Sequence, residues 1–186
     1  CQSNAVRCGC AGYFDAVAGL PCRMVGWSTK NPARHLKLEE LCEEIGKTHK
    51  ENEPKSYDFQ MSKSHKDYLM GQSPYSTLTL NYDFRTAAHI DRGDLQNSLS
   101  TLTILEEIEN NYEGCYLGLP EYKIALNVKS GDTLIFDAHE YHANTEMKVL
   151  SDKLPIDDLT GNPFGGRISI VAYLRNRIGD CPSMSE

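Results

Sequence analysis

The strongest hydrophobic pattern in the chain is the helical one in residues 34–49. Leu38, Leu41 and Ile45 recur three and four residues apart, with glutamates between them. Apolar positions at this spacing form one face of an α-helix, and Pro32 lies just ahead, where helices commonly start. We therefore predict a helix over residues 34–49 whose apolar face packs against a sheet.

The rest of the front part, residues 1–74, is polar and rich in turn-forming residues. It leaves room for a short helix at residues 13–18 and another at residues 62–70. The apolar run over residues 22–28 predicts a first strand. Together these elements predict a helical and loop-rich front.

From residue 75 onward the pattern changes to short apolar and β-branched runs, separated by glycine, proline, aspartate and asparagine. Strands are expected at residues 76–82, 87–91, 100–105, 115–118, 122–128, 133–137 and 167–175. Many short strands behind a helical front predict a mainly β fold with packed helices (α+β), with a double-sheet jelly roll or related barrel as its core. We expect a single domain over residues 1–186, a β core at residues 75–178 and a long connection at residues 150–166.

Composition and charge are those of an ordinary globular protein. Hydrophobic residues make up 40% and charged residues 24% of the 186 residues. No apolar run is long enough to span a bilayer and no segment resembles a signal peptide, so we expect an intracellular protein without a membrane partner. The net charge of -7 argues mildly against extended contact with nucleic acid, although residues 30–37 and 63–66 are locally basic.

The seven cysteines are an odd number, scattered through a chain too large to need a disulfide framework. We therefore expect free thiols. The alternative is a structural zinc site at Cys8, Cys10 and Cys22 with a distant fourth ligand. The spacing of Cys8 and Cys10 is, however, tighter than that of common zinc fingers.

The candidate chemistry starts with His89 and Asp91, which are two residues apart in a segment predicted to be extended. Because successive side chains leave a strand on opposite faces, these two leave it on the same face. With one further histidine they would form the 2-His-1-carboxylate triad, which holds Fe(II) and leaves coordination positions open. His139 and His142 compete for that place, and an unbroken strand would let only one of them point inward.

The final strand carries the second candidate group. Arg167 and Ser169 face one side of it, and the alternate apolar residues face the other. A buried arginine needs an anion, and a carboxylate that accepts two of its N–H groups is a natural ligand. The alternative is an ion pair with a surface acid such as Glu146.

The order of these parts resembles that of the Fe(II)/2-oxoglutarate-dependent dioxygenases, and the motifs are similar to those of the TET/JBP family of nucleic-acid base oxygenases. The matching segments are residues 81–91 (NYDFRTAAHID), 131–145 (GDTLIFDAHEYHANT) and 166–173 (GRISIVAY). Residues 12–15 (GYFD) form a weaker match. Three motifs in order are far more specific than any one of them.

The resemblance implies a double-stranded β-helix, a cupin-like jelly roll, with iron between its two sheets. It implies His89, Asp91 and His142 as the iron ligands, because the distal histidine of the family precedes a small residue and Asn or Thr. His139 would then pack beside the metal ligands without binding the metal.

For the cosubstrate and the substrate the resemblance implies further roles. Arg167 and Ser169 would bind the distal carboxylate of 2-oxoglutarate, and Arg85 would contact the cosubstrate or DNA. Asp94 falls where some relatives carry an acid that meets the target base, and an acid that accepts from the amine of cytosine would favour 5-methylcytosine over thymine. The gap between His142 and Arg167 is longer than is usual in the family, so another reductive cosubstrate is the alternative.

The resemblance therefore predicts an enzyme that flips a methylated pyrimidine out of DNA and oxidises its methyl group with O2, Fe(II) and 2-oxoglutarate. Such an enzyme would be nuclear in a eukaryote and cytoplasmic in a phage or bacterial setting. One alternative is a hydroxylase of protein side chains or small molecules, which the net charge of -7 would suit. The other is a non-catalytic β-sandwich binding module in which His89 and Asp91 are structural.

Overall fold

The computed structural model describes residues 7–158 and 161–184 of the chain. Its α-helices lie in the first third of the chain, and most of its strands, joined by loops, lie in the remainder. In chain order the elements are β1 (Cys8–Phe14), β2 (Arg23–Met24), α1 (Gly26–Lys30), α2 (Pro32–Asn52), α3 (Pro54–Lys63), η1 (Lys66–Tyr68), β3 (Thr77–Tyr82), β4 (Ser100–Glu106), β5 (Tyr112–Gly114), β6 (Leu117–Leu119), η2 (Pro120–Tyr122), β7 (Ile124–Leu126), β8 (Thr133–Phe136), β9 (Ala143–Asn144), β10 (Met147–Val149), β11 (Arg167–Tyr173) and η3 (Ile178–Asp180).

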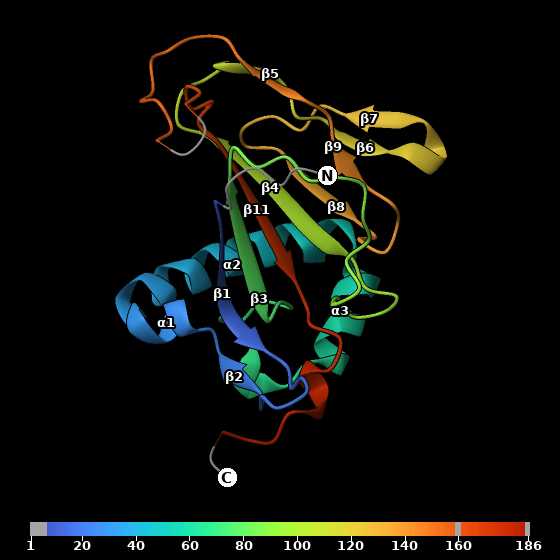
Figure 1. Ribbon diagram of the computed structural model, residues 1–186. Coiled ribbons are helices and arrows are strands. Elements are labelled where there is room, and N and C mark those ends of the chain that lie inside the picture. The colour runs from blue at the N-terminus through green and yellow to red at the C-terminus, as the bar shows by residue number, and fades with distance from the viewer. Residues whose placement is uncertain (1–6, 159–160, 185–186) are drawn as a thin grey trace.

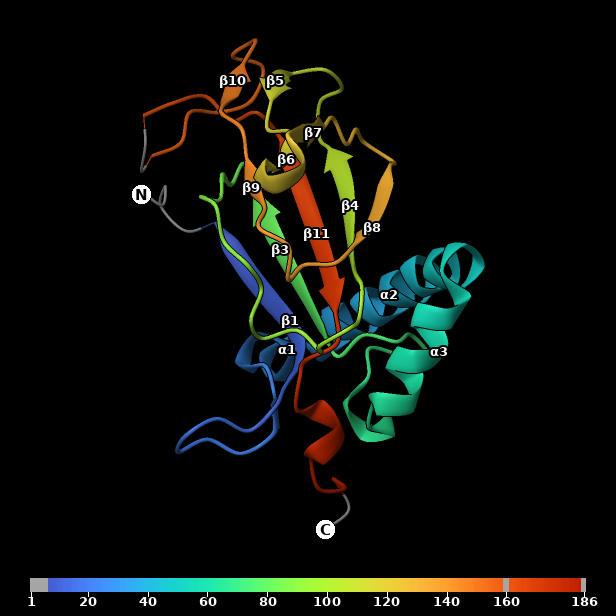
Figure 2. The same ribbon diagram turned by 90° about the vertical axis from the view of Figure 1, so that its right-hand side faces the viewer.

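The strands form one large sheet and two small ones. The large sheet has the order β2-β1-β3-β11-β4-β8, and all neighbouring strands in it are antiparallel. The small sheets are β7-β6-β9 and β10-β5. Figures 1 and 2 show α2 and α3 on one face of the large sheet, with β6, β7 and β9 over the other. The predicted class, mainly β with packed helices, is thus confirmed, and the β layers are arranged like the two sheets of a jelly roll.

The central strand β11 separates an apolar core from a polar face. Ile170 and Ala172 are buried in the core that the large sheet forms with α2. Arg167 and Ser169 lie on the opposite face, under the layer that contains β6 and β9. Period-two alternation along one strand produces both faces, as predicted.

The predicted long helix is confirmed as α2, which continues to Asn52. The helix predicted over residues 62–70 is wrong, because α3 precedes it and only the 3-10 turn η1 lies there. Pro54 starts α3, and the buried side chain of this helix is the polar Gln60, so its sequence shows no apolar pattern. Among the described residues, no helix has both the length and the apolar character needed to cross a bilayer.

The two elements predicted at the very front are wrong in type. No helix forms at residues 13–18, because β1 continues to Phe14 and pairs with β3. Of the strand expected at residues 22–28 only β2 forms, and α1 begins at Gly26. Pairing with a strand distant in the sequence outweighs the weak local pattern here.

Most strands predicted for the β core are confirmed with small shifts at their ends, namely β3, β4, β8 and β11, whereas β6 and β7 are shorter than predicted. Strands β5, β9 and β10 are additional. The strand expected at residues 87–91 is wrong: only His89 pairs there, in an isolated bridge with His142. The two backbone hydrogen bonds of this bridge are enough to fix the position of His89 without forming a strand.

Cys22 and Cys181 form a disulfide, so the expectation of free thiols is wrong for this pair. Their Cα atoms are 5.9 Å apart although the residues are 159 positions apart in the sequence. The fold brings these two distant segments together, which cysteine spacing alone cannot show. Cys8 and Cys10 are free thiols, and the alternative zinc site is excluded because the sulfur of Cys22 is bonded.

Candidate functional site

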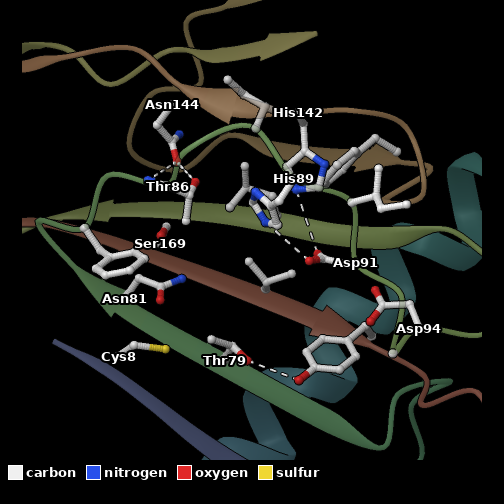
Figure 3. A pocket seen from close by; sticks show the side chains of 18 of the residues that line it. Cys8, Thr79, Asn81, Thr86, His89, Asp91, Asp94, His142, Asn144 and Ser169 are labelled. Atoms are coloured by element: carbon white, nitrogen blue, oxygen red, sulfur yellow. Dashed lines mark hydrogen bonds and ion pairs between the residues drawn. The ribbon is translucent and has the colours of Figure 1, made fainter. Parts of the chain in front are cut away.

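A cavity of about 360 Å³ lies between the large sheet and the layer that contains β6 and β9 (Figure 3). This volume is within the range of small-molecule sites. Strand β11 contributes its polar face, and the loop between β3 and β4 contributes a further wall. The cavity is lined by six of the seven candidate residues from the sequence: His89, Asp91, Asp94, His142, Arg167 and Ser169.

His89, Asp91 and His142 converge on one point of the cavity (Figure 3). One ligand atom from each lies within 4.8 Å of the other two. The Nε2 atom of His89 is 3.3 Å from one carboxylate oxygen of Asp91, and the Nε2 atom of His142 is 3.8 Å from the other. Two imidazoles and one carboxylate, with open space beyond them, are the donor set of a 2-His-1-carboxylate Fe(II) site.

Backbone hydrogen bonds hold the two histidines in place. The N–H of His89 donates to the carbonyl of His142 and the reverse bond also forms, each with an N to O distance of 3.0 Å. The Nδ1 atom of each ring lies 2.8 Å from a backbone carbonyl oxygen two residues earlier. Donation from Nδ1 leaves Nε2 free as a ligand atom, which is the tautomer that a metal requires.

Protons and a metal ion would compete for these two rings. The hydrogen bond to Asp91 raises the pKa of His89, whereas burial lowers the pKa of His142. Because a metal binds the neutral imidazole, the affinity of this cluster for a metal ion would fall as the pH falls.

His139 does not line the cavity. Its Nδ1 atom lies 3.2 Å from a carboxylate oxygen of Asp137, which also accepts from the backbone N–H of His139 at 2.9 Å. Residues 138 and 139 form a turn, so the chain does not continue here as the unbroken strand that the alternation argument assumed. The structure therefore brings His142, and not His139, to the other two ligands.

Arg167 carries a buried cation that forms no ion pair among the residues that the structure describes. Its residue is 2% exposed, and its Nε atom has no hydrogen-bond partner. Within the described residues no carboxylate forms an ion pair with Arg167, and this includes Glu146. An unpaired buried charge is costly, so the site fits an anionic ligand, with the hydroxyl of Ser169 on the same face of β11.

Asp83 fixes the point where the chain enters β11. Its carboxylate accepts from the backbone N–H groups of Gly165, Gly166 and Arg167 at 2.7, 3.2 and 2.8 Å. These three hydrogen bonds fix the end of the long connection, residues 150–166. The length of that connection therefore does not move Arg167 out of the cavity.

Asp94 is a buried acid on the wall of the same cavity. It is 4% exposed, and the hydroxyl of Ser100 donates to its carboxylate at 2.6 Å. Burial raises the pKa of Asp94 to about 7. Near neutral pH this side chain is therefore available both as an acceptor and, when protonated, as a donor.

Arg85 is the candidate that the structure leaves outside the cavity. Its side chain is exposed, whereas its neighbours Phe84 and Thr86 line the wall. Contact with a cosubstrate in this cavity is therefore not supported by the geometry. Contact between Arg85 and DNA stays a prediction.

Among the further side chains that line the cavity are Cys8, Thr79, Asn81 and Tyr173, none of which the sequence pattern assigned to it. Tyr173 leaves β11 on the same face as Arg167, so the alternation of that strand could have identified Tyr173 as a cavity residue. Cys8 could not be identified in this way, because only the pairing of β1 with β3 places it opposite Asn81. The Tyr173 hydroxyl lies 3.3 Å from that of Thr79, so these two residues form part of one polar wall.

Comparisons with known proteins agree with this geometry. Residues 9–176 match Tet_JBP, described as the oxygenase domain of the 2OGFeDO superfamily. The bifunctional helicase and thymine dioxygenase JBP2 of Trypanosoma brucei brucei is 34% identical over 90% of this chain and 15% of its own length. The thymine dioxygenase JBP1 of the same organism is 30% identical over 96% of this chain and 20% of its own length. The chain thus spans less than a quarter of these curated relatives.

A solved structure, NgTET1 in complex with 5mC DNA, has a similar fold. It aligns with a TM-score of 0.64 and 16% sequence identity, over 94% of this chain and 63% of that chain. At this identity the similarity concerns the fold alone. Together, this similarity in fold and the match to the oxygenase domain confirm the predicted jelly-roll class.

Proposed function

The chain belongs to the Tet_JBP family, the oxygenase domain of the 2OGFeDO superfamily, and we propose that this Fe(II)- and 2-oxoglutarate-dependent dioxygenase oxidises the methyl group of a pyrimidine in DNA. One observation carries the proposal: a single cavity brings together three side chains that could hold a metal ion, a buried arginine that forms no ion pair with any described carboxylate, and a buried acid. The thymine dioxygenase names of the relatives support a DNA base as the substrate. The protein would then act where DNA lies, in the nucleus of a eukaryote or the cytoplasm of a bacterium.

The residues of the cavity divide into two sets. His89, Asp91 and His142 would hold Fe(II) and leave the remaining coordination positions facing the cavity. Arg167 and Ser169 would bind the distal carboxylate of 2-oxoglutarate. When bound, Fe(II) would activate O2, which is the oxidant, and 2-oxoglutarate would supply two of the four electrons as it loses CO2, the substrate methyl group supplying the other two.

The walls of the cavity favour a flipped base. Leu102, Leu117 and Phe136 contribute apolar side chains, which limit the water around the reacting methyl group. The metal ligands lie between two β layers, so a methyl group inside a stacked duplex could not reach them. The target nucleotide would have to leave the helix and enter the cavity, as with other enzymes that act on bases.

Asp94 is the residue that we propose to read the base. As a carboxylate it would accept from the exocyclic amine of 5-methylcytosine, and as a neutral acid it would donate to O4 of thymine. With a pKa raised to about 7 by burial, both forms are present near neutral pH. The preference for 5-methylcytosine stays a prediction, and the relatives support thymine as the first substrate to test.

We expect the ratio of 5-methylcytosine to thymine oxidation to rise with pH. Ionisation of Asp94 between about pH 6 and pH 8 replaces a donor by an acceptor, which should change the ratio roughly tenfold. Asp94→Asn keeps the shape of the side chain but does not titrate, so its ratio should be nearly constant over this range. Nucleoside mass spectrometry of duplexes that contain both bases measures the ratio.

Two results of that experiment would count against the proposal. A pH profile of the ratio that is the same in the wild type and in Asp94→Asn would remove Asp94 from base recognition. No oxidised nucleoside from the wild-type protein at either pH, with Fe(II) and 2-oxoglutarate present, would overturn the proposed function itself.

A further inference from the structure

An apolar loop projects from the large sheet between β1 and β2 (Figure 2). Residues 16–21 carry no polar side chain (AVAGLP). Val17 and Leu20 pair through two backbone hydrogen bonds of 3.0 and 2.9 Å, and Gly19, with φ +81°, allows the tight turn between them. These two side chains are 48% and 49% exposed. The tip is therefore ordered by its backbone and presents apolar groups outward.

The base of this loop is anchored by a buried ion pair. Asp15, which is 4% exposed, accepts from Arg175 Nε at 2.8 Å and from the backbone N–H of Arg177 at 3.1 Å. The guanidinium groups of Arg175 and Arg23 lie 4.9 and 5.6 Å from the centre of the Phe14 ring. These contacts hold the loop at a fixed place relative to β11.

The same anchor belongs to the rim of the cavity. Arg175 lines the cavity, and its backbone forms a bridge with Asp94. The next residue, Asn176, donates its backbone N–H to the carbonyl of Gly93 at 3.0 Å. The apolar loop is therefore tied to the segment that carries the proposed base-reading residue.

Several arginines lie near the loop although the chain has a net charge of -7. Arg92 is exposed at the cavity rim, and the side chain of Arg177 is 63% exposed, with Asp180 3.8 Å from its Nε atom. Arg23 is half-buried at the base of the loop, where it donates to the carbonyl of Pro21 at 3.0 Å. Arginines around an exposed apolar tip complement a polyanion with an apolar interior, which is the chemistry of a nucleic-acid duplex.

We propose that the Val17–Leu20 tip inserts into the DNA duplex and fills the space that the target base leaves when it flips into the cavity. This inference rests on the proposed function, because it needs a flipped base beside the loop. Apolar side chains that enter between base steps are a known way to unstack and kink a duplex. The tip lowers the cost of base flipping, and the nearby arginines hold the phosphates.

The test compares a duplex with the same methylated strand in single-stranded form. In a Val17→Ser, Leu20→Ser double variant we expect oxidation of the duplex to fall roughly tenfold or more, whereas single-stranded oxidation stays within about twofold, because an unpaired base needs no wedge. Leu36→Ser is the matched control, since Leu36 is 59% exposed on α2 and should change neither rate. A second readout needs no turnover: 2-aminopurine beside the target base should brighten with the metal-free wild type and stay dim with the double variant.

An unchanged ratio of duplex to single-stranded activity, together with unchanged fluorescence, would overturn the wedge. An equal loss on both substrates would also overturn it, because the loop would then support the fold or another contact. Absence of any oxidised base with the wild-type protein would instead overturn the proposed function. The fluorescence would still report whether the loop enters DNA.

Discussion

Replacing His142 by alanine will abolish iron binding, whereas replacing His139 by alanine will leave it intact. The Nε2 atom of His142 is one of three ligand atoms within 4.8 Å of one another, while His139 is held by Asp137 outside the cavity. Loss of a direct ligand should weaken iron binding by more than about a hundredfold, since changes to residues behind the ligands alone cost ten- to a hundredfold. Elemental analysis of anaerobically loaded protein measures the iron content.

His142 is buried and its ring lies against Phe136, so its removal also leaves a small void. Asp91→Ala separates the two effects, because the side chain of Asp91 is one-third exposed and its loss should remove iron with little change in stability. Iron retained by both His142→Ala and Asp91→Ala would show that this cluster is not the metal site. It would also favour the reading of His89 and Asp91 as structural residues of a binding module. Iron lost from His139→Ala as fully as from His142→Ala would contradict the choice of His142 over His139.

Arg167→Met should remove the binding of 2-oxoglutarate while leaving iron in place. The guanidinium is buried and its Nε atom has no hydrogen-bond partner among the described residues, and two charge-assisted hydrogen bonds to a carboxylate are worth about 3 kcal/mol or more. The dissociation constant for 2-oxoglutarate should therefore rise roughly a hundredfold, which calorimetry of the iron-loaded protein under nitrogen measures. Arg85→Met is the control, because Arg85 lies outside the cavity and should leave the affinity unchanged.

The same substitution should stabilise the protein when 2-oxoglutarate is absent. Burying an unpaired cation costs free energy, and an apolar side chain of similar length removes that cost, with a gain of about 1–3 kcal/mol in the free energy of unfolding. With 2-oxoglutarate present the wild type should be the more stable of the two proteins, because only the wild type gains stability from the ligand. A large loss of stability in Arg167→Met without the cosubstrate would mean that the arginine has a structural partner and is not an anion site.

The sequence predicted the parts of the fold that depend on a regular pattern. The apolar face of α2 and the alternation along β11 are both local and periodic, and both are confirmed. The same alternation separated Arg167 from Ile168, which is why the polar face of β11 could be assigned before the sheet was known. The meeting of His89, Asp91 and His142 followed from the order of the motifs, and their role as metal ligands stays a prediction.

The parts that could not be predicted depend on contacts between distant segments. β1 has no pattern of its own and becomes a strand because β3 pairs with it. The place of Cys8 in the cavity follows from that pairing, and the Cys22–Cys181 disulfide joins two segments that are 159 positions apart. The turn at residues 138 and 139 decides between the two competing histidines, and alternation could not predict it.

The most direct test of the central claim is to measure, in one reaction, the succinate formed from 2-oxoglutarate and the oxidised nucleosides formed in DNA that contains thymine and 5-methylcytosine. We predict that the wild-type protein with Fe(II) and O2 forms both products, in equal amounts for the first oxidation, and that His142→Ala forms neither. We further predict that an unmodified peptide mixture does not replace the DNA. Succinate formation that a peptide or a metabolite stimulates, without any oxidised nucleoside, would contradict the assignment to DNA.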